Sequence, residues 1–259
     1  KKLNALKFIG RAKVETTVID KNSQNIDIVV EETQTGSFNV GLSIGTLDGL
    51  SFVSGLKENN INGTGRTLEF LVNTNSNNKE FVLSTSDKFF INNNINHGYS
   101  LKYKENDFSK SQSYKLNTLT LDTSFKYEFS NFTYHAFGLG YSLKEYQVTD
   151  VLSASSTIMN SQGENVSFNI SNDFTRNTLN SYIKPSKGNF ISFANYLETP
   201  SSSTNGFIQN LITGKKYFTL NKNIFSAQSK AGNIISLNDS EILSDNKFSL
   251  GGRWLRGFD

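Results

Sequence analysis

The sequence contains no cysteine and only two prolines, Pro185 and Pro200, among its 259 residues. Without cysteine, neither a disulfide scaffold nor a thiolate metal site can form. Because proline cannot donate a hydrogen bond to a neighbouring strand, its scarcity leaves long strands almost uninterrupted. Only two histidines are present, His97 and His135, and no nucleophile or base accompanies them in a fixed motif. We therefore expect no enzymatic activity, no cofactor and no bound metal.

The net charge is small and the apolar runs are short. The formal net charge of +3 is too small to indicate a nucleic acid partner. No apolar run approaches the roughly 18 residues that a membrane-spanning helix requires, which excludes a helical membrane protein. Aromatic residues nevertheless make up 12% of the chain, with 21 Phe and 10 Tyr. A transmembrane β-barrel fits this composition, because its strands face lipid and lumen alternately and have a polar average.

Strict alternation of apolar and polar residues occurs in several segments. In residues 38–45, "FNVGLSIG", every second side chain is apolar and the others are small or polar. The same period of two recurs in residues 118–129, 132–144 and 164–171. The polar faces carry Asp, Lys, Glu and Asn, which are too hydrophilic for the interior of a sandwich. They suit a solvated lumen, so the alternation favours a barrel.

The spacing of turns supports the same architecture. Short turns at residues 62–65, 92–96, 130–131 and 221–223 alternate with longer polar stretches. Outer-membrane barrels arrange short turns at one end and long loops at the other. We expect about eleven antiparallel strands of roughly 8 to 15 residues after residue 36, with boundary errors of a few residues. Because bacterial single-chain barrels close with an even number of strands, we expect this all-β, transmembrane barrel to be incomplete.

Residues 1–35 differ in character from the rest of the chain. They contain two candidate strands, at 12–19 and 26–30, separated by the turn "DKNSQN" and followed by the acidic "EETQTG". This pattern predicts a soluble β-hairpin that closes a small α+β domain. Gly36 is then the hinge into a second domain, residues 36–259. The sequence has neither a starting Met nor an apolar signal segment, so we expect it to be part of a longer protein.

Three stretches resemble the BamA-type outer-membrane protein assembly factors of the bacterial surface antigen superfamily. Residues 25–70 are similar to the junction between the last POTRA domain and the first barrel strands of that family. Residues 172–190 resemble a mid-barrel segment of the pattern Asp-x-x-Arg-Asn and Pro-x-x-Gly, matched here at Asp173, Arg176, Asn177, Pro185 and Gly188. The three stretches occur in the family's order over nearly the whole chain.

The third stretch, "LGGRWLRGF", is similar to the signature of the family's sixth extracellular loop, which folds back into the lumen. The signature is matched at Gly251, Gly252, Arg256, Gly257 and Phe258. Leu255 stands where Val is commoner, and Trp254 where smaller residues are frequent. By the resemblance, the Arg256 guanidinium pairs with an inward-facing carboxylate on a strand outside this sequence. The resemblance also implies a parent barrel of about sixteen strands, an even number like that of other bacterial barrels.

The resemblance implies that the first barrel strand is a lateral gate. Three glycines, Gly36, Gly41 and Gly45, weaken the pairing of this strand and its register, although glycines can also mark only a bulge or a curved corner. An open seam exposes backbone groups that template an incoming strand. The predicted gate strand comprises Ser37, Phe38, Asn39, Val40, Gly41, Leu42, Ser43, Ile44 and Gly45.

The implied function is the folding and insertion of β-barrel proteins into the bacterial outer membrane, with the N-terminal segment in the periplasm. The partners would be unfolded outer-membrane proteins presenting their C-terminal strands, accessory assembly lipoproteins, and outer-membrane lipid and lipopolysaccharide, but not nucleic acid. Two alternatives stay open at this point. One is a two-partner secretion or translocation-and-assembly transporter of the same superfamily, and the other is a passive porin.

Overall fold

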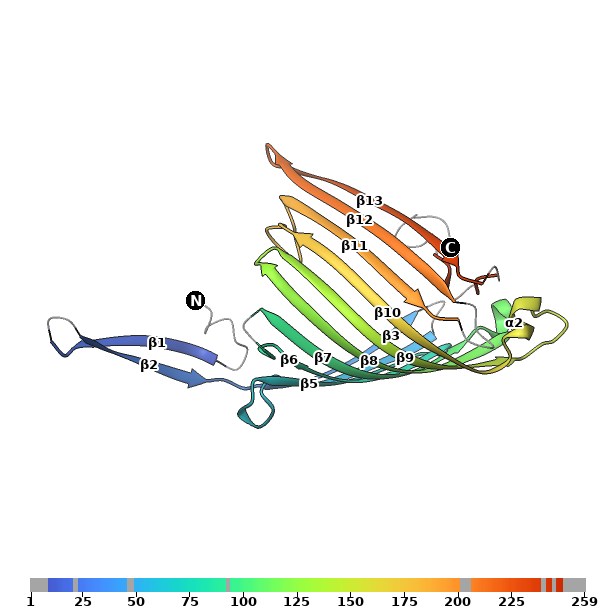
Figure 1. Ribbon diagram of the computed structural model, residues 1–259, viewed down its shortest axis with the longest axis horizontal. Helices are drawn as coiled ribbons and strands as arrows, with labels where there is room; N and C mark the ends of the chain where they lie inside the picture. Colours follow the sequence, from blue (N-terminus) through green and yellow to red (C-terminus); the bar gives the residue numbers. More distant parts are fainter. Residues whose placement is uncertain are drawn as a thin grey trace.

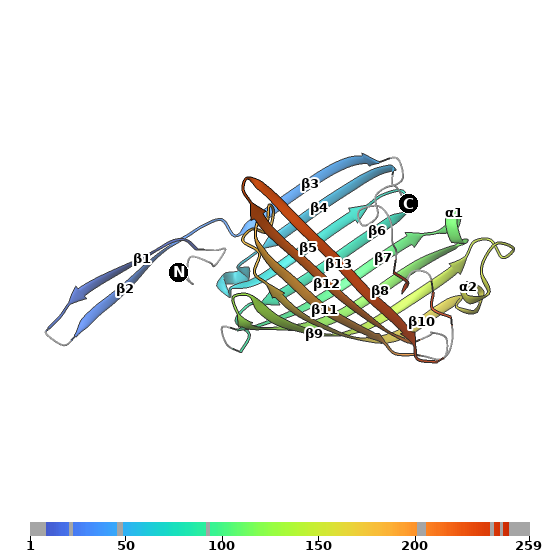
Figure 2. The same cartoon turned by 90° about the horizontal axis from the view of Figure 1, so that it is seen from above.

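The fold consists of two separate antiparallel sheets. The computed structural model describes residues 9–20, 23–45, 49–91, 94–200, 206–238, 241–243 and 246–248. A two-stranded sheet is followed by an eleven-stranded sheet in which the strands lie in sequence order. The larger sheet is curved and its strands are tilted, while the hairpin extends away from one end (Figures 1 and 2). Within the described residues no helix is both long and apolar enough to cross a membrane.

The N-terminal hairpin pairs β1 (Ile9–Val18) with β2 (Gln24–Glu32). The structure thus has a hairpin where the sequence predicts one, with strands two or three residues longer than expected at three of the four ends and one residue shorter at the end of β1. Apolar side chains on both strands are exposed, among them Val14 at 60% and Ile26 at 62%. The assignment of this hairpin to a POTRA domain stays a prediction.

Eleven strands form the large sheet, as the sequence predicts, and each pairs with the next. Among the described residues, three short helical segments lie in the connections: η2 (Ile61–Gly63), α1 (Ser109–Gln112) and α2 (Ser156–Asn160). The strands are β3 (Gly36–Gly45), β4 (Gly49–Glu58), β5 (Arg66–Thr74), β6 (Asn78–Asp87), β7 (Ile95–Asp107), β8 (Tyr114–Ser130), β9 (Thr133–Val148), β10 (Gly163–Asn177), β11 (Gly188–Glu198), β12 (Phe207–Leu220) and β13 (Asn223–Ser236).

The register sorts the side chains of these strands into an apolar and a polar face. One row of cross-strand partners runs through β3 to β10 and is almost entirely apolar: Phe38, Leu56, Phe70, Leu83, Leu101, Leu121, Tyr141 and Phe168. The adjacent row is polar or glycine: Ser37, Lys57, Glu69, Ser84, Ser100, Asp122, Gly140 and Asn169. The apolar face is uncovered, since Phe38 is 67% and Phe168 60% exposed. It is the outward, lipid-facing side, and the polar face lines the lumen.

The connections differ at the two ends of the sheet. At the end that adjoins the hairpin, called the hairpin end below, β8 and β9 are joined by the tight turn at residues 131–132 and β12 and β13 by the turn at 221–222. At the opposite, distal end, β7 is joined to β8 through α1 and β9 to β10 through α2. The expected short turn at 92–96 lies partly outside the described residues. The predicted asymmetry is found only in part, because the distal end also has the short β5–β6 connection at residues 75–77, and the hairpin end has the longer β10–β11 connection at residues 178–187.

Gly188 begins β11 and ends the connection from β10, and its backbone conformation requires glycine. Its φ of +109° is unfavourable for other residues, and an added Cβ would collide with the carbonyl group of Thr178. We expect Gly188→Ala to lower the free energy of unfolding by at least ~1 to 2 kcal/mol. Thermal or denaturant unfolding of the complete protein in detergent measures this change.

Gly41→Ala is the matched control, because a Cβ at Gly41 meets no atom within 4 Å. Equal unfolding midpoints for the two variants would contradict the backbone argument.

Candidate functional site

The predicted gate residues all lie on β3, the edge strand of the large sheet. β3 pairs with β4 through ten consecutive residue pairs, from Gly36 opposite Glu58 to Gly45 opposite Gly49. Its outward apolar side chains are exposed, with Leu42 at 71% and Ile44 at 86%. Within the described part of the chain no strand pairs with the other edge of β3, and β13 forms the opposite edge. One row of backbone N–H and C=O groups on β3 is therefore open for pairing.

The turn between β4 and β5 holds the linker that leads from the hairpin into β3. Asn59 donates from its backbone N–H (3.1 Å) and from its side-chain Nδ2 (2.7 Å) to the carbonyl oxygen of Thr35. Glu58 lies opposite Gly36 in the ladder, and its Oε1 accepts the backbone N–H of Asn60 at 2.7 Å. The predicted hinge at Gly36 is thus tied to the first turn at the hairpin end.

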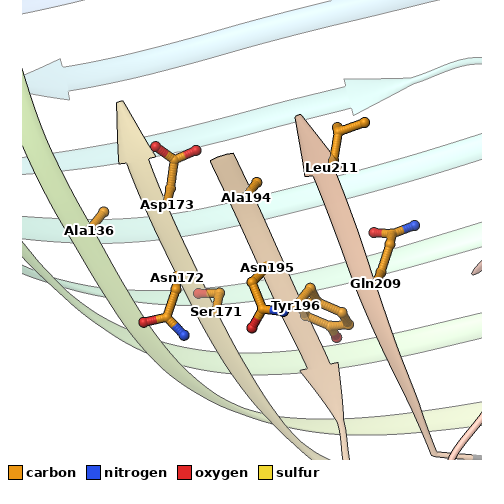
Figure 3. Close-up of a pocket in the computed structure, with 9 residues that line it drawn as sticks. All are labelled: Ala136, Ser171, Asn172, Asp173, Ala194, Asn195, Tyr196, Gln209 and Leu211. Carbon is orange, nitrogen blue, oxygen red and sulfur yellow. The ribbon is translucent and has the colours of Figure 1, made fainter. Parts of the chain in front are cut away.

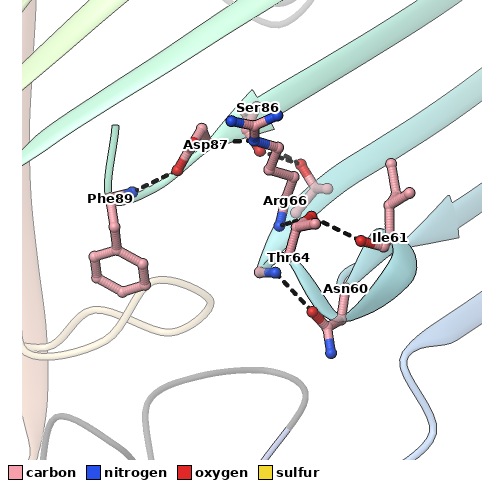
Figure 4. Close-up of polar contacts among 9 residues, drawn as sticks. Asn60, Ile61, Thr64, Arg66, Ser86, Asp87 and Phe89 are labelled. Atoms are coloured by element: carbon pink, nitrogen blue, oxygen red, sulfur yellow. Dashed lines mark hydrogen bonds and ion pairs between the residues drawn. The ribbon is translucent and has the colours of Figure 1, made fainter. Parts of the chain in front are cut away.

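The same turn is closed by local hydrogen bonds that explain its sequence, "ENNINGTGR" (Figure 4). The Asn60 side chain accepts the backbone N–H of Gly65 at 2.7 Å, and the Thr64 hydroxyl donates to the carbonyl of Ile61 at 2.7 Å. Asn62 and Gly63 both have positive φ, 51° and 73°, which Asn and Gly tolerate best. Residues 62–65 thus form part of a turn, as predicted.

Arg66 connects this turn to the turn between β6 and β7. Its Nε lies 3.1 Å from Asp87 Oδ2, and Asp87 Oδ1 accepts the backbone N–H of Phe89 at 3.0 Å (Figure 4). The pair is exposed on the outward face, so its contribution to stability is small. Its effect is to align two neighbouring turns beside the hinge.

The structure does not bring the mid-barrel family residues into a single site. Asp173 faces the lumen from β10, whereas Arg176, three residues later, faces outward because side chains alternate along a strand. The Asn177 side chain accepts the backbone N–H of Leu179 at 3.0 Å and starts the loop to β11. Pro185 lies within that loop and Gly188 ends it. This segment therefore shapes a hairpin-end connection, with Asp173 as its one lumenal member.

Asp173 lies beside a shallow lumenal cavity of about 200 Å³ on β10 to β12 (Figure 3). Its carboxylate accepts hydrogen bonds from the hydroxyls of Thr175 and Ser192, the latter at 3.1 Å. Tyr196 and Gln209 line the same cavity from β11 and β12. These groups form a polar lumen wall, consistent with the solvated interior that the alternation predicts.

The predicted lumen-loop residues, Gly251, Gly252, Arg256, Gly257 and Phe258, lie outside the described residues. The segment before them is placed on the lumenal face. Gln209 Nε2 lies 3.4 Å from the carbonyl oxygen of Asn246, and the Phe248 ring packs against lumen-facing Gly232. The chain leading towards the predicted motif therefore already lies inside the curve of the sheet.

An apolar cluster lies on the distal part of the lumenal face. Tyr114 and Leu116 from β8, Tyr146 from β9, Ile158 from α2 and Leu243 pack together and are at most 8% exposed. This is the main buried apolar cluster among the described residues. It covers the distal part of the lumenal face of β8 and β9.

A hydrogen bond and an ion pair anchor the segment that contributes Leu243. The Thr157 hydroxyl donates to Glu241 Oε2 at 2.6 Å, and Lys247 Nζ lies 3.4 Å from Glu241 Oε1. The Thr157 hydrogen bond, and after it the charge of Lys247, hold the pKa of Glu241 below its ordinary value. Glu241 therefore stays ionised at neutral pH and keeps the segment attached to α2.

A buried ion pair lies beneath the cluster. Lys144 Nζ, on β9, lies 2.8 Å from both carboxylate oxygens of Glu198, on β11, and the two side chains are 10% and 3% exposed. The Tyr196 hydroxyl donates to the same carboxylate at 3.2 Å. The pair spans β10 and so connects strands that are not direct neighbours.

Sequence reasoning identified neither the cluster nor the ion pair. A signal for the cluster was present, because Tyr114, Leu116 and Tyr146 are apolar residues at lumen-facing positions of otherwise amphipathic strands. The pairing of Lys144 with Glu198 had no such signal, since 54 residues separate them and the lumen contains other charges. The histidines lie on different strands, β7 and β9, and His97 is packed against the rings of Phe90, Tyr99 and Phe125.

A model of the Omp85 superfamily domain matches residues 60–259. That match covers most of the chain, including β5 to β13 with their outward apolar and lumenal polar faces. The chain therefore belongs to the Omp85 superfamily, and its place is the bacterial outer membrane.

Within that superfamily the chain is similar to outer membrane protein assembly factors named BamA. It is 22% identical to BamA of Nitratidesulfovibrio vulgaris over 97% of this chain and 32% of the relative. It is 25% identical to BamA of Neorickettsia risticii over 98% of this chain and 34% of the relative. For BamA of Buchnera aphidicola the identity is 29% over 55% of this chain and 24% of the relative. The chain spans about a third or less of the length of these relatives.

Two solved structures have a similar fold. BamA from Haemophilus ducreyi lacking POTRA domains 1–3 superimposes with a TM-score of 0.82 at 20% identity, over 97% of this chain and 51% of that chain. CdiB from Acinetobacter baumannii gives 0.58 at 13% identity, over 99% of this chain and 50% of that chain. The resemblance to BamA-type factors, drawn from three motifs, is confirmed.

The buried ion pair gives a quantitative expectation. Lys144→Met leaves the Glu198 carboxylate buried without its cation, and we expect a loss of about 3 to 5 kcal/mol in the free energy of unfolding. The double variant Lys144→Met/Glu198→Met removes both charges, and we expect it to recover most of that loss. Unfolding of the complete protein in detergent measures both values. A double variant as unstable as the single one would contradict a direct pairing.

Proposed function

We propose that this chain is the gate-bearing part of an outer-membrane assembly factor that folds β-barrel proteins and inserts them into the membrane. The observation that carries the proposal is β3, an edge strand paired on one side and exposed on its outward face. The names of the similar relatives, outer membrane protein assembly factor BamA, support the same function. The predicted gate residues 37–45 retain this role as a proposal.

The chemistry of such a gate is backbone hydrogen bonding. In hydrocarbon an unpaired N–H or C=O group costs several kcal/mol. An arriving strand that pairs with β3 avoids this cost along the paired edge. Main-chain bonds do not depend on side chains, which lets clients of many sequences use one edge. No covalent step is needed, because the client's own burial in lipid supplies the free energy.

Gly41 is suited to this exchange. A Cβ there would meet no atom within 4 Å, so the lumenal side of the middle of β3 is open. The strand consequently has few side-chain contacts that fix its register, and pairing with a closing strand of the complete protein would rest on the backbone. A client strand replaces the closing strand more easily when the seam is held mainly by backbone hydrogen bonds than when packed side chains fix it.

The hairpin β1–β2 is proposed as the end of a POTRA domain in the periplasm. Its exposed Val and Ile side chains indicate that further residues cover one of its faces in the complete protein. The contacts of Asn59 with Thr35 would transmit the orientation of this domain to Gly36 and β3. Accessory lipoproteins and lipopolysaccharide remain proposed partners, alongside unfolded outer-membrane proteins with their C-terminal strands.

Two other functions are less well supported. A two-partner secretion transporter would share the fold, but the CdiB structure superimposes less well than the BamA structure, with TM-scores of 0.58 and 0.82. A passive porin is not favoured by the match to the Omp85 superfamily domain or by the similarity to outer membrane protein assembly factors. The proposed inward Arg256 loop would narrow the lumen.

Depletion of the complete protein from its host tests the insertase function. We expect the folded amounts of several unrelated outer-membrane barrels to fall together within a few generations, because all would depend on one edge strand. Quantitative proteomics of outer-membrane fractions provides the measurement, and inner-membrane proteins are the internal control. Unchanged barrel levels, with loss only of one secreted substrate or of small-solute uptake, would instead support a transporter or a porin.

A disulfide across the seam tests the gate itself. Gly41→Cys, combined with a cysteine opposite it on the closing strand of the complete protein, should stop growth under oxidising conditions and permit it with reductant. The matched control joins Gly41→Cys to Val53→Cys, its partner on β4, where a bond fixes strands that are already paired. Normal growth with the seam disulfide fully formed would exclude opening at β3.

A further inference from the structure

The loop that connects β10 to β11, residues 178–187, presents an exposed apolar tip at the hairpin end of the sheet. Tyr182 in this tip is 95% exposed and Ile183 is 88% exposed. Lys184 and Lys187 follow closely in the sequence. An aromatic and an aliphatic side chain beside lysines are typical of segments that lie in the interface of a membrane.

Hydrogen bonds hold the loop in shape although its tip is not buried. The Asn180 side chain donates to Ser186 Oγ at 2.8 Å and accepts the backbone N–H groups of Ser186 at 3.0 Å and Lys187 at 3.1 Å. The Ser181 hydroxyl accepts the backbone N–H of Lys184 at 3.1 Å. These bonds fix the backbone on both sides of the tip, so the tip can bind a partner with little further loss of conformational entropy.

A hydrogen bond to β12 fixes the depth of the loop. The Thr219 hydroxyl donates to the carbonyl oxygen of Ser186 at 3.0 Å. On the outward face of β12 the two neighbours of Thr219 are apolar, with Phe218 46% and Leu220 60% exposed. Phe218 is stacked on Phe225 of β13, with 5.4 Å between the ring centroids. Because exposed aromatic residues at the ends of barrel strands mark the membrane interface, the loop lies at the level of the lipid headgroups.

Five cationic side chains lie in and beside the loop. Arg176 and Lys216 face outward from β10 and β12, and Lys222 lies in the β12–β13 turn. These three and the two lysines of the loop have no side-chain ion pair or hydrogen bond within the described residues. Residues 174–192 and 212–225 contain no Asp or Glu, so the positive charge of this region is not balanced locally.

The hairpin end of β4 to β6 has a different balance of charges. There the outward Arg66 is paired with Asp87 at 3.1 Å, and the Glu58 carboxylate accepts the backbone N–H of Asn60 at 2.7 Å. This part of the end therefore carries acidic as well as basic groups, whereas the part under β10 to β13 carries basic groups alone. The difference points to an anionic partner for the second part.

We propose that the β10–β11 loop and the β12–β13 turn bind anionic phospholipids of the periplasmic leaflet. Tyr182 and Ile183 enter the layer between headgroups and acyl chains, and the five cations contact the lipid phosphates. Arg176 and Lys216 favour lipid over an acidic periplasmic protein, because they extend from the lipid-facing side of their strands. The leaflet follows from the periplasmic location of the N-terminal hairpin. The proposal does not depend on the gate function.

Fluorescence quenching tests the insertion of the tip. Ile183→Cys is introduced into a cysteine-free background of the complete protein, labelled with the fluorophore NBD and reconstituted in vesicles of phosphatidylcholine and phosphatidylglycerol. Asn62→Cys, in the exposed polar turn between β4 and β5, is the matched control. We expect lipids that carry a spin label near the headgroup to quench the Ile183 label about threefold more strongly than the Asn62 label.

Removal of charge tests the preference for anionic lipid. Lys184→Gln/Lys187→Gln removes two cations from the loop, and Arg66→Gln/Lys88→Gln removes two from the hairpin end of β5 and β6 as the matched control. Native mass spectrometry of the complete protein measures the binding of phosphatidylglycerol, with phosphatidylcholine as the neutral lipid. We expect the loop variant to bind phosphatidylglycerol about tenfold more weakly and the control to change by about twofold at most. Lys222→Gln provides the same test if the loop variant does not fold.

Three results would overturn the proposal: equal quenching at the two labelled positions, equal binding of the two lipids by the unaltered protein, or unchanged phosphatidylglycerol binding in the loop variant. An Ile183 label that lipid does not quench but that cross-links to a periplasmic protein would also overturn it and would assign the loop to that protein. Failure of the insertase function would leave the quenching and the lipid binding unchanged, so the two proposals can be distinguished.

Discussion

The structure depends on the pairing of every backbone N–H and C=O group that meets hydrocarbon. Within a membrane no water replaces a missing hydrogen-bond partner, so a strand edge that is left unpaired raises the free energy of the structure. β4 to β12 meet this requirement fully, whereas β3 and β13 meet it on one side in the described chain. The unpaired groups of β3 form the edge that the proposed gate would use. The proposed gate follows from this constraint more than from any particular side chain.

Side chains then adapt each face to its surroundings. Outward positions carry Phe, Leu, Ile and Tyr, and lumenal positions carry Ser, Asn, Lys and Glu. Two groups of residues do not follow this pattern of outward apolar and lumenal polar side chains. Tyr114 and Tyr146 are aromatic residues on the lumenal face, where they pack against Ile158 of α2 and Leu243. Asn195, Asn210 and Asn233 are polar residues on the lipid-facing side and are hydrogen-bonded to one another.

Much of the fold could be read from the sequence, since period-two alternation reports directly on which face of a strand is buried or solvated. The eleven strands, the hairpin and the short turn at residues 62–65 were all predictable for this reason. Boundaries were less so: β8 begins four residues before the alternating segment because Tyr114 and Leu116 break the polar face. Asp173 and Arg176 belong to one sequence motif, but alternation within a strand places them on opposite faces of β10.

By itself the sequence determined the class of fold, its superfamily and its orientation of polar and apolar faces, because these depend on local periodicity and on short motifs. Only the tertiary structure decided the register, and register is a relation between residues far apart in the chain. It joined Lys144 to Glu198, tied Asn59 to Thr35 beside the hinge, and aligned Asn172, Asn195, Asn210 and Asn233 across four strands. A shift of one residue in any strand would turn its side chains to the other face and remove these contacts.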